Sequence, residues 1–240
     1  MGTISKTRFF PWSTLFAGLV GFALRSWLYS DMQDSLLPAD HPAGVLSFVL
    51  LALVLAACWF GVRKVVSCDN YAQLFPRSVA GGVGTLLAAV GFGLTAFGNR
   101  GIGIFPILIP ILGVLAAIAL AASGLFRLKG QKPFWLLHCV VAVYLMARTM
   151  SCCSAWSAQT QMQLYFFQLL ACCFLMLATY YRVSICILGG RPGLYVFFSQ
   201  AALFCCCLCC VGSDWLFYLS AGMWMAADYC LLPSPEQSEP

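Results

Sequence analysis

Residues 102–126 of the chain read IGIFPILIPILGVLAAIALAASGLF, a run without a single Asp, Glu, Lys or Arg. A hydrocarbon core about 30 Å thick is crossed by roughly 20 apolar residues of helix, so this run is long enough to span a bilayer. The rest of the sequence has the same character, since 62% of the 240 residues are hydrophobic, 9% are charged and the mean hydropathy is +0.89. Soluble domains carry about 25% charged residues, which excludes an ordinary water-soluble fold.

Long segments nearly free of charge recur along the chain, as transmembrane helices require. They predict eight spans, at 9–29, 45–62, 79–97, 102–126, 134–150, 164–181, 194–211 and 215–232. In hydrocarbon each segment must satisfy its own backbone N–H and C=O groups, and the runs lack the alternation of a β-barrel. We therefore expect an all-α, polytopic transmembrane helical bundle, a single domain over 1–232, with a disordered polar tail at 233–240.

Basic residues gather on alternate connectors. Ten of the thirteen Lys and Arg fall on one side of the predicted bundle: Lys6, Arg8, Arg63, Lys64, Arg77, Arg127, Lys129, Lys132, Arg182 and Arg191. The other side takes only Arg25, Arg100 and Arg148. The positive-inside rule then places both termini in the cytoplasm and predicts a multi-pass protein of the cell membrane, with the lipid bilayer as its first partner. Because the basic residues are spread over several short segments, no nucleic-acid partner is expected.

Similar charge spacing in the two halves of the sequence suggests an internal duplication. Arg25 and Arg148 each end a span before a polar outer loop, and Arg63 and Arg182 follow in the next inner connectors. Two four-helix halves, about 1–126 and 127–232, would explain this spacing. Any evenly spaced eight-helix protein with basic inner loops would show it as well, so both explanations stay open.

Ionisable residues inside spans are the candidate functional groups, because burying them costs free energy unless they mark a pathway. His138 and Asp228 are each about one helical turn inside the cytoplasmic end of a span, so they form a proton-carrying pair if they touch, or are solvated separately if they do not. Arg25 and Arg148 lie near the outer interface, where they pair with acidic residues or bind an anion in a vestibule. Trp224 lies one turn before Asp228 and belongs to the bundle core or to a pocket wall.

The chain contains fourteen cysteines, five of them within 205–210. These five spread around one helix and cannot all face one metal ion, so we interpret them as small packing residues. The loop at 31–42 holds three Asp and His41, but too few ligands for Ca²⁺ or Zn²⁺, and Asp40 with Pro42 is typical of a helix start. No metal or cofactor is expected.

Two further spans have features of helix packing. In 79–97 the small residues Ala80, Gly84 and Ala88 recur every four positions, which indicates close approach of a neighbouring helix. The short turn at 98–101 makes this span an antiparallel neighbour of 102–126, in which Pro106 and Pro110 predict an interruption or kink. Tryptophans near the predicted interfaces form an aromatic belt: Trp12, Trp27, Trp59, Trp135 and Trp215.

Three short stretches, FALRSWLY at 22–29, LLPADHP at 36–42 and YYRV at 180–183, resemble uncharacterised multi-span membrane proteins of Gram-positive bacteria. This resemblance implies a membrane bundle and no particular activity.

The sequence favours a transporter or permease component for an ion or small molecule. The alternative is a non-catalytic membrane protein, an interaction, regulatory or assembly subunit that binds a second copy or a membrane partner. An enzyme is not expected, since His41 and His138 fall on opposite sides of the membrane and no nucleophile and base stand together.

Overall fold

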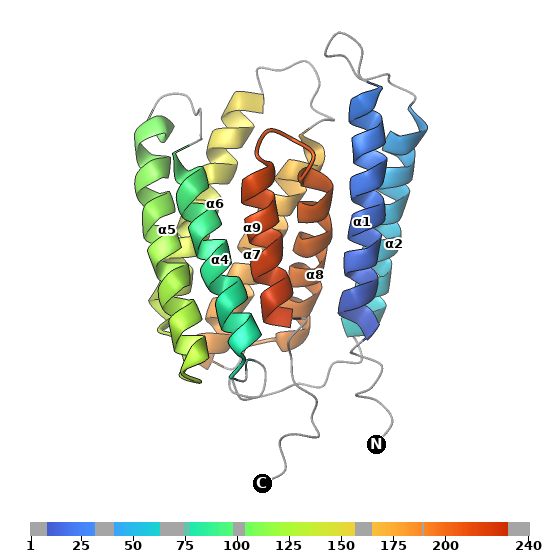
Figure 1. Cartoon of the computed structure of the whole chain (residues 1–240). Coiled ribbons are helices and arrows are strands. Elements are labelled where there is room, and N and C mark those ends of the chain that lie inside the picture. The colour runs from blue at the N-terminus through green and yellow to red at the C-terminus, as the bar shows by residue number, and fades with distance from the viewer. Residues whose placement is uncertain are drawn as a thin grey trace, which may run out of the picture.

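The computed structural model describes residues 9–31, 41–62, 75, 77–97, 104–156, 165–188 and 190–229. The described residues form helices and no strand. In order these are α1 (Phe9–Ser30), α2 (Pro42–Val62), α4 (Val79–Ala96), α5 (Phe105–Leu128), α6 (Trp135–Trp156), α7 (Phe166–Leu188), α8 (Pro192–Cys209) and α9 (Trp215–Tyr229), shown in Figure 1. Each predicted span corresponds to one helix, which confirms the all-α fold.

Six of the helices are long and apolar enough to cross a membrane, namely α2 and α4 to α8. The chain is therefore a multi-pass membrane protein by the length and composition of its helices. α1 has 22 residues but is not among these six, and α9 has only 15 residues, about 22 Å, which is short of the bilayer core. That these two helices also cross the bilayer stays a prediction.

The helices pack as a ring with an attached pair. Neighbours touch in the order α4, α5, α6, α7, α8 and α9, and α9 returns to α4 and closes the ring. α1 and α2 touch each other and lie against α8, outside this ring (Figure 1). The expected contact between the helices around 79–97 and 102–126 is confirmed as α4 against α5. The predicted halves 1–126 and 127–232 stay a prediction.

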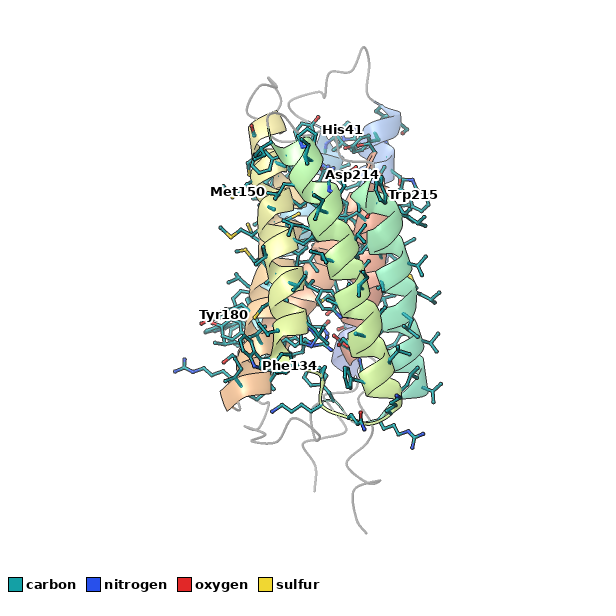
Figure 2. All side chains as sticks on the ribbon, turned by 90° about the vertical axis from the view of Figure 1, so that its left-hand side faces the viewer. His41, Phe134, Met150, Tyr180, Asp214 and Trp215 are labelled. Atoms are coloured by element: carbon teal, nitrogen blue, oxygen red, sulfur yellow. The ribbon has the colours of Figure 1, made fainter. Side chains whose placement is uncertain are left out.

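The two ends of the bundle hold different residues. α1 begins and α9 ends at the lower end of the view in Figure 1. Phe134 and Tyr180 lie toward this lower end, whereas His41 and Asp214 lie at the upper end (Figure 2). That the lower end faces the cytoplasm stays a prediction of the charge bias.

Aromatic side chains fill the interior of the ring. The ring centroid of Phe92 is 5.7 Å from that of Tyr144, 5.2 Å from Phe217 and 6.3 Å from Trp224, and all four side chains are fully buried. Trp224 therefore belongs to the core. The five tryptophans assigned to the aromatic belt are instead 39–63% exposed.

The small residues of α4 pack against α9, as their spacing predicts. A Cβ atom on Gly84 would lie 2.6 Å from Cβ of Ala227, and one on Gly91 would lie 2.6 Å from Cβ of Ser220. Neither contact leaves room for a methyl group. Ala80 is exposed, so the close-packed face runs through Gly84 and Gly91 rather than starting at Ala80.

Cysteine and proline residues have local roles in the described helices. Cys205, Cys206 and Cys209 are buried in the main core, which confirms that they pack. Pro106 lies in the first turn of α5, where its missing N–H costs no hydrogen bond, so the predicted interruption at this position is wrong. Pro110 lies within the continuous helix.

Candidate functional site

A buried carboxylate at the lower end of the bundle forms ion pairs with two arginines. Asp228, in the last turn of α9, is 1% exposed. Its Oδ1 accepts a hydrogen bond from Nη1 of Arg127 on α5, and its Oδ2 accepts one from Nη1 of Arg182 on α7. The hydroxyl of Tyr195 on α8 donates to the same Oδ2 at 3.2 Å. We name these four residues the Asp228 cluster, which joins four helices of the ring.

The two guanidinium groups of the Asp228 cluster are enclosed by rings and by a glycine. Cζ of Arg182 is 5.0 Å from the ring centroid of Phe75 and 5.6 Å from that of Trp224, and Cζ of Arg127 is 6.0 Å from Phe75. On the α4 side a Cβ atom at Gly81 would lie 2.6 Å from Cζ of Arg127, so a larger residue at this position would require the guanidinium group to shift. Rings and backbone thus replace water around both cations.

The predicted pair of His138 and Asp228 is not formed. Both side chains are buried, but the three donors of the cluster occupy the Asp228 carboxylate, and neither ring nitrogen of His138 has a hydrogen-bond partner in the described part of the chain. α5 and α7 extend past the predicted ends at 126 and 181. Arg127 and Arg182 are therefore helix residues facing Asp228 rather than connector charges.

The sequence does contain a signal for these longer helices. Gly130 has φ +70° and its N–H donates to the carbonyl of Arg127 at 3.1 Å, and Gly190 has φ +42°. Glycine in this left-handed region commonly follows the last turn of a helix. Taking Gly130 and Gly190 as helix-ending residues would have kept both arginines inside their helices. Nothing comparable in the sequence points to Tyr195.

A third buried arginine, Arg148, lies toward the upper end. Arg148 on α6 is 2% exposed, and its Nη2 donates to Oδ2 of Asp214 at 3.1 Å. Its Nη1 donates to the Tyr144 hydroxyl at 3.3 Å, and its Cζ lies 3.8 Å from the Phe217 ring centroid. Of the two interpretations left open for Arg148, the structure shows the pairing with an acidic residue. The Asp214 side chain is 38% exposed, so this pair reaches the surface.

Arg25 has a different environment. It is 3% exposed, and its Cζ lies 5.3 Å from the ring centroid of Tyr29 and 5.2 Å from that of Phe167. Asp214, one of its expected partners, bonds to Arg148 instead, and Asp31 bonds to His41. The third expected partner, Asp34, lies outside the described residues.

His41 joins α1 to α2 at the upper end. Its Nε2 is 3.1 Å from Oδ2 of Asp31, and its Nδ1 accepts a hydrogen bond from the N–H of Ala43 at 3.2 Å. α2 begins at Pro42 as predicted, and His41 provides the cap, while Asp40 lies outside the described residues. No three His, Cys, Asp or Glu side chains are grouped as metal ligands in the described segments.

Comparison of the chain with protein-family models, with curated proteins and with solved structures finds no match.

Proposed function

We propose that the chain is a small membrane transporter, a permease for an ion or small molecule. The observation that carries this proposal is the presence of a paired carboxylate at each end of α9. Asp214 directly precedes the helix and bonds to Arg148 of α6, and Asp228 in the last turn bonds to Arg127 and Arg182. Ionisable groups are expensive inside a membrane bundle and concentrate along substrate pathways.

With ion pairs at both of its ends, α9 can separate from its neighbouring helices at one end while the other end stays bound. α9 approaches α4 closely at Gly84 and Gly91, and Phe92 of α4 packs against Phe217 and Trp224 of α9. The Asp214 carboxylate is 38% exposed, so its pair with the buried Arg148 separates at a lower cost than the Asp228 pairs, which are buried on both sides and hold the other end. The upper end of α9 is thus the one that opens first.

A non-catalytic interaction or assembly subunit is the second candidate. The observation that favours it is the saturation of Asp228, whose carboxylate already accepts three hydrogen bonds. In such a protein the ion pairs of Asp214 and Asp228 would stay closed, and solute flux would be absent.

Flux across reconstituted liposomes separates the two candidates. The full chain is placed in vesicles of phosphatidylethanolamine and phosphatidylglycerol, and currents and isotope uptake are measured for sodium acetate, sodium phosphate, alanine, potassium chloride and glycerol. We expect protein-dependent flux of at least one solute, changed several-fold by Asp214→Asn. The matched control is Asp31→Asn, which removes an exposed carboxylate away from α9 and should leave the flux unchanged. Absence of flux for the whole panel contradicts transport.

A further inference from the structure

Two aromatic side chains beside the Asp228 cluster have buried nitrogen atoms without partners. Nε1 of Trp224 and both ring nitrogens of His138 make no hydrogen bond within the described segments, and both side chains are 0% exposed. Nε of Arg182 is likewise buried and makes no hydrogen bond within the described segments. Buried polar groups are nearly always paired, because an unpaired one costs about 1–3 kcal/mol. These groups therefore point to a ligand.

Two of these side chains meet at one guanidinium group, and the third lies on a neighbouring helix. The Trp224 ring centroid is 5.6 Å from Cζ of Arg182, and His138 lies on α6, which packs against α7, the helix of Arg182. They come from three helices of the ring, α9, α6 and α7. One Arg182 nitrogen, Nη1, is engaged by Asp228, which leaves Nε for another partner.

The chemistry of these groups selects an acceptor. An indole N–H and a guanidinium only donate hydrogen bonds, and a neutral imidazole presents one N–H in either tautomer. The nearby carboxylate of Asp228 is occupied by its three donors. Beside a guanidinium in a low-dielectric interior a charged acceptor is held more strongly than a neutral one.

We propose that Arg182, Trp224 and His138 form a binding site for a small oxyanion, a carboxylate or a phosphate group. This inference rests on the proposed transport function and names its substrate class. An anion bound there shares Arg182 with Asp228 and so weakens one of the contacts that hold the lower end of α9. Substrate binding and release of the helix are coupled through this one guanidinium.

Binding is measured by isothermal titration of the detergent-purified full chain with sodium acetate, sodium phosphate and acetamide. Acetamide has nearly the shape of acetate without its charge. We expect acetate or phosphate to bind and acetamide to bind at least about tenfold more weakly, since hydrogen bonds to charged groups are the stronger ones. Equal affinity for acetate and acetamide, or binding of none of the three, overturns the proposal.

The variant Trp224→Phe removes the indole N–H and keeps an aromatic ring. It should weaken anion binding about tenfold, the factor expected for one hydrogen bond to a charged group. Trp215→Phe is the matched control on the same helix, because Trp215 is 50% exposed, and it should leave the affinity unchanged. An unchanged affinity in Trp224→Phe overturns the proposal. Should this variant not fold, the unaltered chain decides, because acetate and not acetamide must raise its unfolding temperature.

A displacement experiment identifies the source of the anion, and the combination of binding with flux data separates the proposed site from the proposed transport. If phosphatidylglycerol displaces bound phosphate, the site takes a lipid headgroup, and if it does not, the site takes a free anion; both results support an oxyanion site. If the chain binds an anion but carries no solute, the transport proposal is contradicted and the proposed anion site is supported. If the chain carries potassium or glycerol but binds no anion, the proposed anion site is contradicted and the transport proposal is supported.

Discussion

At the scale of single residues, Asp228 is the carboxylate that pairs with two buried guanidinium groups in the part of the chain described. Its carboxylate balances Arg127 and Arg182 where neither guanidinium reaches water, since their side chains are 3% and 1% exposed. The attraction is strong in this environment, but so is the cost of removing each charge from water. The cluster therefore contributes more to choosing one helix arrangement than to net stability, and it is sensitive to the loss of one member.

The variant Asp228→Asn should be strongly destabilised, because it keeps the size of the side chain and removes the charge that two buried cations face. Breaking a buried pair in this way costs about 3–5 kcal/mol. Thermal unfolding in detergent, followed by tryptophan fluorescence, measures the loss. Asp31→Asn is the control, since its side chain is 48% exposed, and it should cost less than about 1 kcal/mol. Equal small losses in both variants would show that Asp228 does not hold the lower end together.

At the scale of elements, the contact between α4 and α9 is set by the size of individual residues. Gly91 faces Ser220 so closely that a Cβ atom would lie 1.7 Å from the Ser220 Oγ. Gly93, two residues further along the same helix, has room, because its Cβ atom would lie 3.6 Å from Cβ of Ala117. The sequence pattern identified α4 as a close-packing helix, but it could not say which glycines face α9.

The substitution Gly91→Ala should push α9 away from α4 and destabilise the protein by about 1–3 kcal/mol, the usual cost of overpacking. Gly93→Ala should be neutral or slightly stabilising, because alanine favours a helix and meets only ordinary contacts. Unfolding temperatures in detergent measure both effects. Adding Ser220→Gly to Gly91→Ala removes the clashing atoms and should restore part of the loss. Equal behaviour of the two alanine variants would contradict this packing.

At the scale of the whole molecule, the buried arginines change how the charge bias is counted. Arg25, Arg127, Arg148 and Arg182 are buried against rings or carboxylates, so they say less about orientation than exposed cations do. Without them, the segments that the sequence assigns to the cytoplasmic side still hold Lys6, Arg8, Arg63, Lys64, Arg77, Lys129, Lys132 and Arg191, and those assigned to the outer side hold Arg100. The remaining basic residues therefore still predict that the lower end of the bundle faces the cytoplasm.

Fusions with reporter proteins test this orientation. A fluorescent protein joined to the C-terminus should fold and fluoresce, because it stays in the cytoplasm. Alkaline phosphatase joined after Phe97, at the end of α4, should be active, because it is exported to the periplasm of a bacterial host. An inactive phosphatase together with a dark C-terminal fusion would reverse the orientation.

The sequence by itself determined the number, type and approximate bounds of the helices in the described segments, because hydropathy and backbone satisfaction in an apolar solvent act locally along the chain. It also indicated that Asp228 lies inside a span, that Trp224 belongs to the bundle core or a pocket wall, and that Arg148 lies near the outer interface. Only the tertiary structure decided which buried groups meet. Arg127 and Asp228 are 101 residues apart, and Arg182 and Asp228 are 46 apart. Such contacts depend on how the ring of helices closes, and a shift of one helical turn would have brought different side chains to the carboxylate.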